Sequence, residues 1–406
     1  MKTTEPKAGS QRPLSLSDLN VNQLAARVSD LGAESYRVTQ ILDGAWRSVA
    51  TSWSEVTTLG KPLQERLANE IRFSAFDEVE RQEAEDGATT KLLLTLSDGA
   101  KVEAVLMRSP ADPRRGSGPR ATVCVSSQAG CAVGCPFCAT GELGFTRNLS
   151  AGEIQDQVRI ARQILRTEDR ELTNVVYMGM GEPLQNIDAV FASIDGLTEP
   201  ARGGIGQRRI TVSTSGVVPG IERLAKQRPQ ITLAVSLHAA RNPLRDLLVP
   251  LNRKWPVEAV IAAADGHSRA TGRRTTYEVT MIDGINDRAE DSAALASLLR
   301  GSGAHVNLIP MNAVAHTPWQ ESKPERIEQI ANQLRAAGLT VTVRRNRGRE
   351  AGAACGQLAA EKAGAPTPVA VARRRELLVA ASAAALRGSA PHSQSLHPGH
   401  LAVMHE

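Results

Sequence analysis

Three cysteines lie within eight residues of the segment GCAVGCPFCATG, which covers residues 130–141. Cys131, Cys135 and Cys138 have the spacing C-x3-C-x2-C. Thiolates this close together are typical ligands of zinc or of an iron–sulfur cluster. A structural zinc site usually takes four ligands, often from two CxxC or CxxC/HxxxH pairs. No such second pair is present, because Cys124 lies in a strand-like run and Cys355 lies more than two hundred residues downstream.

Three thiolates fit a different kind of site. A four-iron, four-sulfur cluster bound by three cysteines leaves one iron without a protein ligand, and a small chelating molecule can take that position. The spacing, with Phe137 between the last two cysteines, resembles the radical S-adenosylmethionine (SAM) superfamily. This resemblance implies one 4Fe-4S cluster on the three cysteines, with the amino and carboxylate groups of SAM on the open iron.

Length and composition narrow the class of protein. The chain has 406 residues, of which 41% are hydrophobic, so two or three structural units are expected. Five cysteines in such a chain do not suggest a disulfide-knotted secreted domain. The N-terminus has no apolar stretch resembling a signal peptide, and no run of eighteen apolar residues suggests a membrane span. We therefore expect a cytoplasmic protein with reduced thiols and no membrane contact.

The net charge and the aromatic content say less about the binding partner than the cysteine motif says about the cofactor. The formal net charge of +5 is a mild bias toward polyanions. Phe, Trp and Tyr together make up 3% of the chain, which argues against a broad surface on which bases stack.

The N-terminal part of the chain predicts a small helical unit followed by a hairpin. Val21, Leu24 and Val28 have helical spacing, and the segments YRVTQILDGAWRSVA and LGKPLQERLANEI predict two more helices. The segment TKLLLTLSDGAKVEAVLM alternates around a turn at SDGA, as a β-hairpin does. We expect residues 1–12 to be disordered and residues 13–107 to form an accessory, RNA-binding domain.

From residue 122 the pattern changes to strand-like runs alternating with helical patterns. The predicted strands are TVCVSS, TNVVYMG, RRITVST, QITLAVSLH, TTYEVTMI, HVNLIPMN and TVTVRR. Alternating strands and helices favour a parallel sheet, and six or seven units predict a partial or complete β/α barrel. This core would cover 122–359, after a Pro/Gly/Arg-rich connector at 108–121 and before a low-complexity tail at 360–406 with one helix.

Glycines and polar residues follow the ends of the predicted strands, where a barrel binds its ligands. The run YMGMGEPL supplies Gly181, which lets a ligand approach the backbone, and Glu182, which can accept bonds from an ammonium group. The runs VSTSG, SLH and IPMN add a hydroxyl, an imidazole and an amide. Each of these residues also has a purely structural explanation: a glycine-rich turn for YMGMGEPL, a core histidine for His238 and a turn residue for Asn312. Their shared position at strand ends favours ligand binding over these explanations.

The two remaining cysteines have open roles at this point. An isolated cysteine is most often a small buried apolar residue. Cys355 follows the arginine-dense run RRNRGRE, whose charge favours the thiolate. The same arginines fit a phosphate contact or a solvated charged surface equally well. Cys124 lies seven residues before Cys131.

Taken together, long motifs over residues 13–360 resemble the RlmN/Cfr family of radical SAM RNA adenine methyltransferases, most closely the RlmN branch. The motifs are CVSSQAGCAVGCPFCATGELGFTRNL, MGMGEPL, VSTSG, AVSLHA, VNLIPMN and AACGQLA, in this order. The resemblance implies an α/β fold with a partial (β/α) barrel as the radical SAM core and a small N-terminal helical accessory domain. It also implies SAM contacts at Gly181, Glu182, Ser213, Ser236, Leu237, His238 and Asn312.

The family chemistry implies a role for the remaining thiols and uses two SAM molecules per turnover. One SAM methylates Cys355, and a second is cleaved to a 5′-deoxyadenosyl radical that takes hydrogen from this methyl group. The methylene radical adds to the base. Cys124 then resolves the covalent adduct, leaving a transient disulfide with Cys355. Glu103 matches the family's proton acceptor, although a solvated acid on a hairpin strand would have the same sequence pattern.

The resemblance also implies the substrate and the partners. The RlmN branch implies methylation of C2 of an adenosine in 23S rRNA, with tRNA as a further expected substrate. The Cfr branch implies methylation of C8 and antibiotic resistance, and the sequence separates the two products poorly. A radical SAM enzyme for a small molecule or peptide is a third hypothesis, against which Cys124 and Cys355 argue. A non-enzymatic RNA-binding protein with a structural metal is a fourth. We expect a flavodoxin-type electron donor and a monomer.

Overall fold

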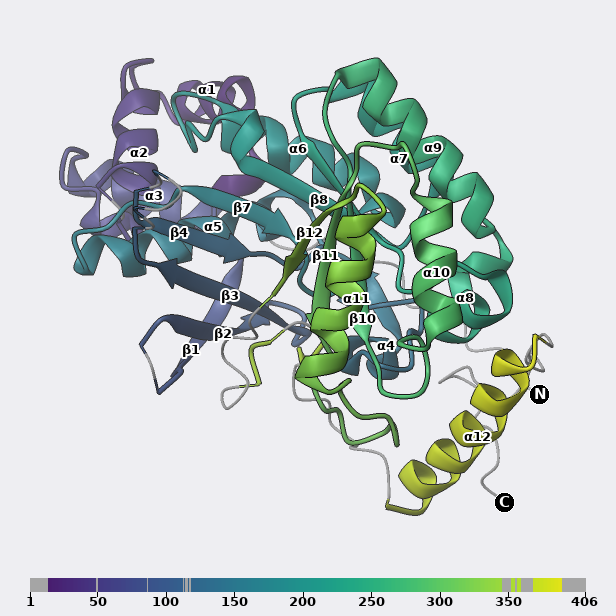
Figure 1. The fold of residues 1–406 in the computed structure, drawn as a ribbon. Coiled ribbons are helices and arrows are strands. Elements are labelled where there is room, and N and C mark those ends of the chain that lie inside the picture. Colours follow the sequence, from purple (N-terminus) through teal and green to yellow (C-terminus); the bar gives the residue numbers. More distant parts are fainter. Residues whose placement is uncertain are drawn as a thin grey trace, which may run out of the picture.

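The computed structural model describes residues 14–48, 50–85, 87–111, 113, 116, 118–344, 352–354, 356–358 and 368–388. Among these residues, ten strands form one sheet with the order β1-β2-β3-β4-β7-β8-β9-β10-β11-β12. Helices flank this sheet, the N-terminal helices lie at one end of the molecule and α12 lies at the other (Figure 1). None of the described helices is long and apolar enough to cross a membrane.

The core of the molecule is a run of parallel strands. Each strand pairs in parallel with its neighbour in the order of the sheet. The strands are β4 (Arg120–Cys124), β7 (Asn174–Tyr177), β8 (Ile210–Thr214), β9 (Thr232–Ser236), β10 (Thr276–Met281), β11 (His305–Pro310) and β12 (Thr340–Val343). β12 ends the order of the sheet, so the barrel is partial. The predicted α/β class and radical SAM core architecture are therefore confirmed.

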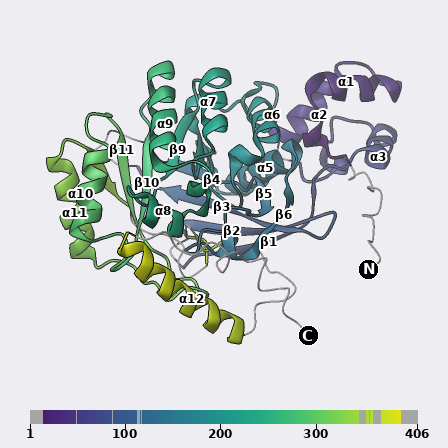
Figure 2. The same ribbon diagram turned by 90° about the vertical axis from the view of Figure 1, so that its right-hand side faces the viewer.

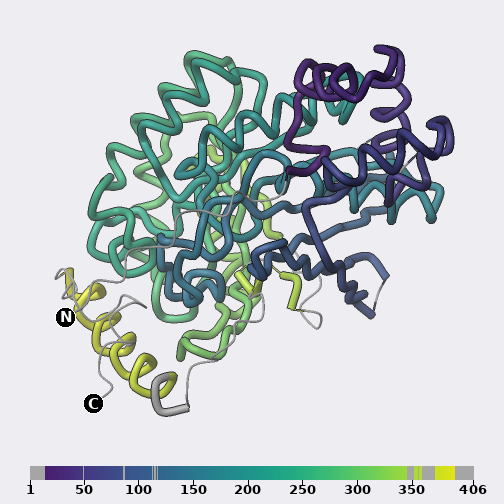
Figure 3. The backbone as a smooth tube through the Cα atoms, turned by 180° about the vertical axis from the view of Figure 1, so that it is seen from behind, coloured from purple at the N-terminus to yellow at the C-terminus, as the bar shows by residue number. Residues whose placement is uncertain are grey.

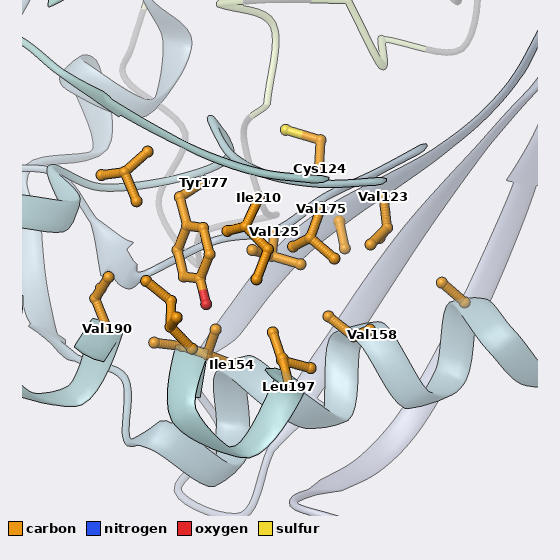
Figure 4. Close-up of a cluster of buried hydrophobic side chains, with 14 of the residues drawn as sticks. Val123, Cys124, Val125, Ile154, Val158, Val175, Tyr177, Val190, Leu197 and Ile210 are labelled. Carbon is orange, nitrogen blue, oxygen red and sulfur yellow. The ribbon is translucent and has the colours of Figure 1, made fainter. Parts of the chain in front are cut away.

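Helices follow most of the parallel strands along the chain and bury their apolar faces against the sheet. They are α5 (Ala151–Thr167), α6 (Ile187–Thr198), α7 (Val218–Gln227), α8 (Asn242–Leu248), α9 (Val257–Thr271), α10 (Ala289–Leu298) and α11 (Pro324–Ala336). In Figure 4, Val123 and Val125 of the β4 segment point toward Ile154 and Val158 of α5. Cys124, between the two valines, points to the opposite side of the sheet, as alternation along a strand requires.

The N-terminal helical unit consists of η1 (Leu16–Asp18), α1 (Val21–Asp30), α2 (Arg37–Trp46), η2 (Trp53–Glu55) and α3 (Lys61–Glu70). Buried hydrogen bonds join it to α5. Asp156, on α5, accepts hydrogen bonds from Ser17 Oγ (2.5 Å) and Ala75 N (2.7 Å), and also from Arg159 Nε of the same helix (2.8 Å). In Figure 3 the unit lies against the helices of the core, on the side of the molecule away from α12.

The predicted hairpin has a third strand and belongs to the main sheet. β1 (Phe76–Glu83), β2 (Thr89–Leu96) and β3 (Lys101–Ser109) pair antiparallel in sequence order, with a turn in which Gly99 has a φ of +80°. β3 also pairs antiparallel with β4, for example Val105 with Cys124. The strands that we expected to form part of a separate accessory domain therefore extend the sheet of the core.

The loop after β4 contains elements that periodicity did not indicate. β5 (Gln128–Gly130) and β6 (Phe145–Asn148) form a two-stranded antiparallel sheet, and α4 (Ala139–Leu143) lies between them in the chain. Three 3-10 turns lie between the main elements: η4 (Pro183–Gln185) follows β7, η5 (Gln207–Arg209) precedes β8, and η6 (Pro250–Arg253) follows α8. The helix expected in the C-terminal tail is present as α12 (Pro368–Leu386).

Candidate active site

A cavity of about 940 Å³ lies inside the partial barrel. Residues from all seven parallel strands contribute to its wall, together with Val105, Met107 and Ser109 of β3. Its volume is at the upper end of the range for small-molecule sites, so it can hold a ligand of nucleoside size with space to spare. The predicted binding residues that line it are Gly181, Glu182, Ser213, Ser236, His238 and Asn312.

Cys131, Cys135 and Cys138 also line this cavity, on the loop between β5 and α4. Cys131 N donates a hydrogen bond to Gly144 O (2.8 Å), and Cys138 N donates one to Cys135 O (3.1 Å). The loop folds tightly, since a side chain at Gly141 would place its Cβ 2.8 Å from Cys135 O. These backbone contacts turn the three thiols toward one space.

Burial dominates the ionisation of two of these thiols. It raises the pKa of Cys131 to about 12 and that of Cys135 well above its usual value, and the nearby Cys138 thiol acts in the same direction on both. As free thiols Cys131 and Cys135 would therefore stay protonated, whereas a bound metal deprotonates a coordinating thiol outright. Three adjacent soft sulfur donors that share one buried loop fit a metal centre better than three separate structural cysteines.

The arrangement suits a cluster better than a single ion. In the part of the chain that the structure describes, no three His, Cys, Asp or Glu side chains are gathered around one position for a metal ion. A 4Fe-4S cluster binds each cysteine through a different iron, so its ligands do not need to converge on one atom. The residues present therefore fit an iron–sulfur cluster with one open position.

Glu182 and Gly181 form a rigid corner of the cavity after β7. Glu182 is 3% exposed, and its Oε2 accepts hydrogen bonds from the N–H and the hydroxyl of Ser215, both at 2.7 Å. Burial nevertheless raises the pKa of Glu182, so a cationic ligand beside it would favour the carboxylate. Gly181 has a φ of +99°, and a Cβ there would lie 2.5 Å from Gln128 Cβ. The backbone at residue 181 lies so close to Gln128 that only glycine fits there without a shift of its neighbour.

His238 has a fixed ring orientation and a fixed charge state. Its φ of +59° is the left-handed conformation, which is uncommon outside glycine. Its Nδ1 accepts a hydrogen bond from Thr280 N (3.1 Å), so the proton of the neutral ring is on Nε2. Burial, assisted by the Arg245 cation, lowers the pKa of His238 to about 3. The ring packs edge-on against Phe137 with 4.7 Å between centroids, which joins the cysteine loop to the β9 end.

The hydroxyls of Ser213 and Ser236 lie 3.4 Å apart on neighbouring strands. Beside them is Glu278, a buried carboxyl on β10 whose pKa is raised by burial. Sequence reasoning missed Glu278, although a charged residue inside the predicted strand TTYEVTMI was a usable signal. Leu237 is fully buried and does not line the cavity, so it can offer a ligand only backbone atoms.

Arg245 is a second residue that the sequence analysis missed. It is fully buried in α8, and its guanidinium donates hydrogen bonds to Leu237 O (3.0 Å) and Ser215 O (2.6 Å). The side chain therefore ties together the segments that follow β8 and β9. Burial lowers the pKa of Arg245 to about 10, which still leaves it charged at neutral pH. Nothing in the run NPLRDLLVP distinguishes it from an arginine on a helix surface.

Cys124 lines the cavity at the end of β4, close in sequence to the cysteine loop. Cys355 lies outside the described residues, as do Arg345, Arg347 and Arg349. The residues on both sides of Cys355 are described, and Ala353, Ala354, Gly356 and Leu358 line the cavity.

The segment around Cys355 is tied to the cysteine loop. Ala139 N donates to Gly356 O (2.7 Å), and Thr140 Oγ1 donates to Leu358 O (2.7 Å). Both donors immediately follow Cys138 in the chain. Two segments more than two hundred residues apart therefore meet at one wall of the cavity.

Glu103 is buried and is not a solvated acid. It is 3% exposed on β3, and its Oε1 lies 3.4 Å from Lys91 Nζ on β2. It is absent from the residues that line the cavity. Lys91 Nζ in turn lies 3.5 Å from the position of a Cβ at Gly352, three residues before Cys355. The pair therefore lies under the Cys355 segment, and the catalytic role of Glu103 stays a prediction.

Comparisons with known proteins agree on one kind of relative. A family model described as the Radical SAM superfamily matches residues 125–296. A probable dual-specificity RNA methyltransferase RlmN from Desulfitobacterium hafniense is 43% identical over 343 residues, which cover 84% of this chain and 95% of that protein. The dual-specificity RNA methyltransferase RlmN of Syntrophobacter fumaroxidans is 41% identical over 349 residues, or 86% of this chain and 99% of that protein.

A solved structure gives the same indication. The crystal structure of a radical SAM methyltransferase from Sphaerobacter thermophilus matches with a TM-score of 0.82 and 46% sequence identity. The match covers 86% of this chain and 100% of that one.

Proposed function

This chain belongs to the RlmN family of radical SAM RNA methyltransferases, and we propose that it methylates C2 of an adenosine in 23S rRNA, with tRNA as a second substrate. The observation that carries the proposal is the meeting of three chemically distinct groups at one cavity: the cysteine loop, Cys124 and the residues that flank Cys355. A radical SAM enzyme acting only on a small molecule does not need the last two.

The three cysteines and the strand ends have separate tasks in this proposal. Cys131, Cys135 and Cys138 would hold a 4Fe-4S cluster, which supplies the electron for reductive cleavage of SAM when a flavodoxin-type donor has reduced it. Glu182 would accept hydrogen bonds from a cationic part of SAM, with the adjacent Gly181 backbone close enough to touch it. The Nε2–H of His238 is a donor, because the ring is neutral at physiological pH.

The remaining thiols would transfer the carbon. Ring carbons such as C2 of adenine are electrophilic, so the base cannot attack the methyl group of SAM directly. Cys355 would carry the methyl-derived carbon to the base as a methylene radical. The adduct would then lose one proton, which Glu103 would take, and one electron, which the oxidised cluster could accept. The Cys124 thiolate would then attack the Cys355 sulfur. An S–S bond forms, the S–C bond breaks, and its electron pair stays with the carbon, which is protonated to a methyl group.

RNA must present a single adenosine to this cavity. The target base lies within folded RNA, so it has to be unstacked and inserted, as other enzymes that act on bases require. The 940 Å³ volume leaves room for a base beside SAM.

Cys124→Ala tests the two-thiol mechanism directly. We expect the variant to accumulate with RNA crosslinked through Cys355, because the adduct forms but cannot be resolved. Thr122→Ala, which changes the next cavity-facing residue of β4, is the matched control and should turn over without trapping RNA. Mass spectrometry of the purified proteins and of RNA digests gives both readouts, including 2-methyladenosine against 8-methyladenosine as the product. An active, RNA-free Cys124→Ala enzyme would refute the mechanism.

A further inference from the structure

The C-terminal helix α12 lies outside the motifs that define the family, yet one side of it is built into the molecule. Between residues 371 and 386 of this helix, the buried residues are Arg374, Leu378, Ser382 and Ala385, and they recur at helical spacing. The neighbours Arg373 and Arg375 are exposed, and Val379 is 57% exposed. A helix with one buried face of this kind is docked against the protein and is not a solvated extension of the chain.

The buried face packs on the apolar residues that support the cysteine loop. Leu378 and Ala385, both fully buried, join one apolar group with Val133 and Phe137 of the loop and with Leu248 of α8. We call this group the cysteine-loop core. The thiol-bearing residues Cys131, Cys135 and Cys138 pack against the same group. Figure 2 shows α12 running across the molecule beside α8, and the two helices are in contact.

Polar contacts fix the position of the helix. Trp319 Nε1 donates a hydrogen bond to Ser382 Oγ (3.2 Å), and that hydroxyl donates to Leu378 O (2.6 Å). Trp319 is itself part of the cysteine-loop core. The register of α12 against the loop is therefore specified by a directional contact as well as by apolar packing.

Arg374 brings a buried positive charge to α4, the helix that begins directly after Cys138. Its side chain is 4% exposed, and one of its terminal nitrogens lies 2.8 Å from Glu142 Oε2. Glu142 Oε2 and Arg374 Nε have no hydrogen-bond partner among the described residues. The two side chains are therefore close together without the alignment that a hydrogen bond requires. The contact is therefore mainly Coulombic. Burial raises the pKa of Glu142, and the Arg374 charge opposes that rise. Without Arg374, the ionised form of Glu142 would be an uncompensated charge four residues from a thiol ligand of the proposed cluster.

We propose that α12 is a clamp on the cluster loop and that Arg374 is a positioning residue for the cluster: the helix covers the cysteine-loop core, and the arginine compensates the charge of Glu142. This inference rests on the proposed function, because it takes the three cysteines to hold the cluster. When α12 is packed on the cysteine-loop core, it holds the cysteine loop in its folded conformation and limits the access of water and oxygen to the cluster. An uncompensated negative charge on Glu142 would oppose the electron that is added to the cluster. Because Arg374 compensates that charge, one-electron reduction of the cluster is easier.

Full-chain variants separate the two parts of the proposal. Leu378→Ala removes buried contact from the clamp, and Val379→Ala is the exposed control on the same helix turn. In the metal-free protein, hydrogen exchange should become roughly tenfold faster at the Cys138 and Gly141 amides in Leu378→Ala and stay unchanged in the control. In the reconstituted protein, the cluster of Leu378→Ala should bleach faster in air.

Arg374→Gln tests the charge, with the exposed Arg373→Gln as control. At a fixed reducing potential, the ratio of reduced to oxidised cluster measured by electron paramagnetic resonance should fall on the order of tenfold in Arg374→Gln. Adding Glu142→Gln should restore the ratio toward the wild-type value, since it removes the uncompensated carboxylate. A merely structural role for Arg374 predicts no such rescue.

The outcomes distinguish this inference from the function beneath it. If the wild-type protein takes up no iron–sulfur cluster, the proposed cofactor is wrong, while hydrogen exchange in the metal-free protein still tests the clamp. Suppose instead that the wild-type protein binds the cluster. If Leu378→Ala then matches its control in hydrogen exchange and bleaching, and Arg374→Gln matches its control in cluster reduction, the clamp is refuted and the cofactor assignment stands.

Discussion

Glu182 and His238 face the same cavity, and burial acts on their pKa values in opposite directions. The pKa of Glu182 is raised, whereas that of His238 is lowered to about 3. Both shifts disfavour the charged form, as burial does for an acid and for a base. A charged ligand beside either group would shift its ionisation, and the SAM proposed for this cavity carries a sulfonium cation and an amino-acid group.

The residues of this wall were largely predictable, because parallel strands end at one edge of a sheet. Gly181, Ser213, Ser236 and Asn312 line the cavity as that rule implies. Charged residues whose partners are distant in sequence were not predictable. Arg245 donates a hydrogen bond to Ser215 O, thirty residues earlier in the chain, and no local pattern reports that contact.

His267 provides a prediction at the residue scale that is independent of the active site. It is 1% exposed on α9, neither ring nitrogen has a hydrogen-bond partner among the described residues, and burial lowers its pKa to about 4. The ordinary pKa is about 6.5, so the unfolded chain takes up a proton on this ring at a higher pH than the folded chain. Stability is therefore lost as the pH falls from about 6.5 toward 4.

His267→Leu should remove that loss while filling the same space. Between pH 7.5 and pH 5 we expect the wild-type protein to lose about 2 kcal/mol more than the variant, since one pKa unit corresponds to about 1.4 kcal/mol. Urea denaturation of the metal-free protein at pH 5 and at pH 7.5 measures the difference. Parallel losses in both proteins would show that another group controls acid unfolding.

At the scale of elements, periodicity located strands and helices and indicated the parallel core, but it did not show how the N-terminal strands join the sheet. The run TTYEVTMI is observed as β10 and the run VARRRELLVAASAAALRG lies within α12 and its C-terminal turn. The meander β1–β3 could not be assigned to the core sheet in advance, because its pairing with β4 closes across the connector at 108–121. The segment GCAVGCPFCATG has no period at all, which is why β5 and α4 were missed.

The contact between α5 and the N-terminal unit gives a prediction at this scale. Asp156 is fully buried and compensates Arg159, which is 1% exposed and also donates to Phe73 O (2.9 Å). Asp156→Ala leaves a buried guanidinium without its anion, which typically costs about 3–5 kcal/mol. We therefore expect the variant to be strongly destabilised, with limited proteolysis cutting first between residues 14 and 75.

Asp188→Ala is the matched control on the next helix. Its ion pair with Arg223 is exposed, with the aspartate side chain 84% accessible, so its loss should cost about 0–1 kcal/mol. Chemical denaturation of both variants checks the contrast. Equal small effects would mean that the Asp156–Arg159 pair does not hold the N-terminal unit in place.

At the scale of the whole molecule, the distribution of charge does not favour the N-terminal unit as an electrostatic RNA dock. Residues 14–75 contain six Lys or Arg and seven Asp or Glu. Deleting this unit would also expose the buried Asp156–Arg159 pair, so a loss of RNA binding on deletion would not identify a contact surface. Substitution of single surface cations is the cleaner experiment.

Arg344 is a cation at a position where it could meet RNA, because it lines the cavity directly after β12 and precedes an arginine-rich segment. Its backbone N–H donates to Leu308 O (2.8 Å), which anchors it to the sheet. If it contacts a phosphate beside the target adenosine, Arg344→Gln should weaken binding of an rRNA fragment and reduce the salt dependence of the affinity by about one ion. Arg344→Lys retains the positive charge and should keep most of the salt dependence of RNA binding. It also leaves a cation beside the buried Glu278.

Lys61→Gln, on the exposed side of α3, tests the N-terminal unit in the same assay. We expect it to leave the salt dependence unchanged, because the unit is nearly neutral and a phosphate-binding surface needs an excess of cations. The measurement is the slope of log affinity against log salt concentration for each variant. An unchanged slope in Arg344→Gln together with a reduced slope in Lys61→Gln would reverse the assignment and place the RNA backbone on the helical unit, away from the cavity rim.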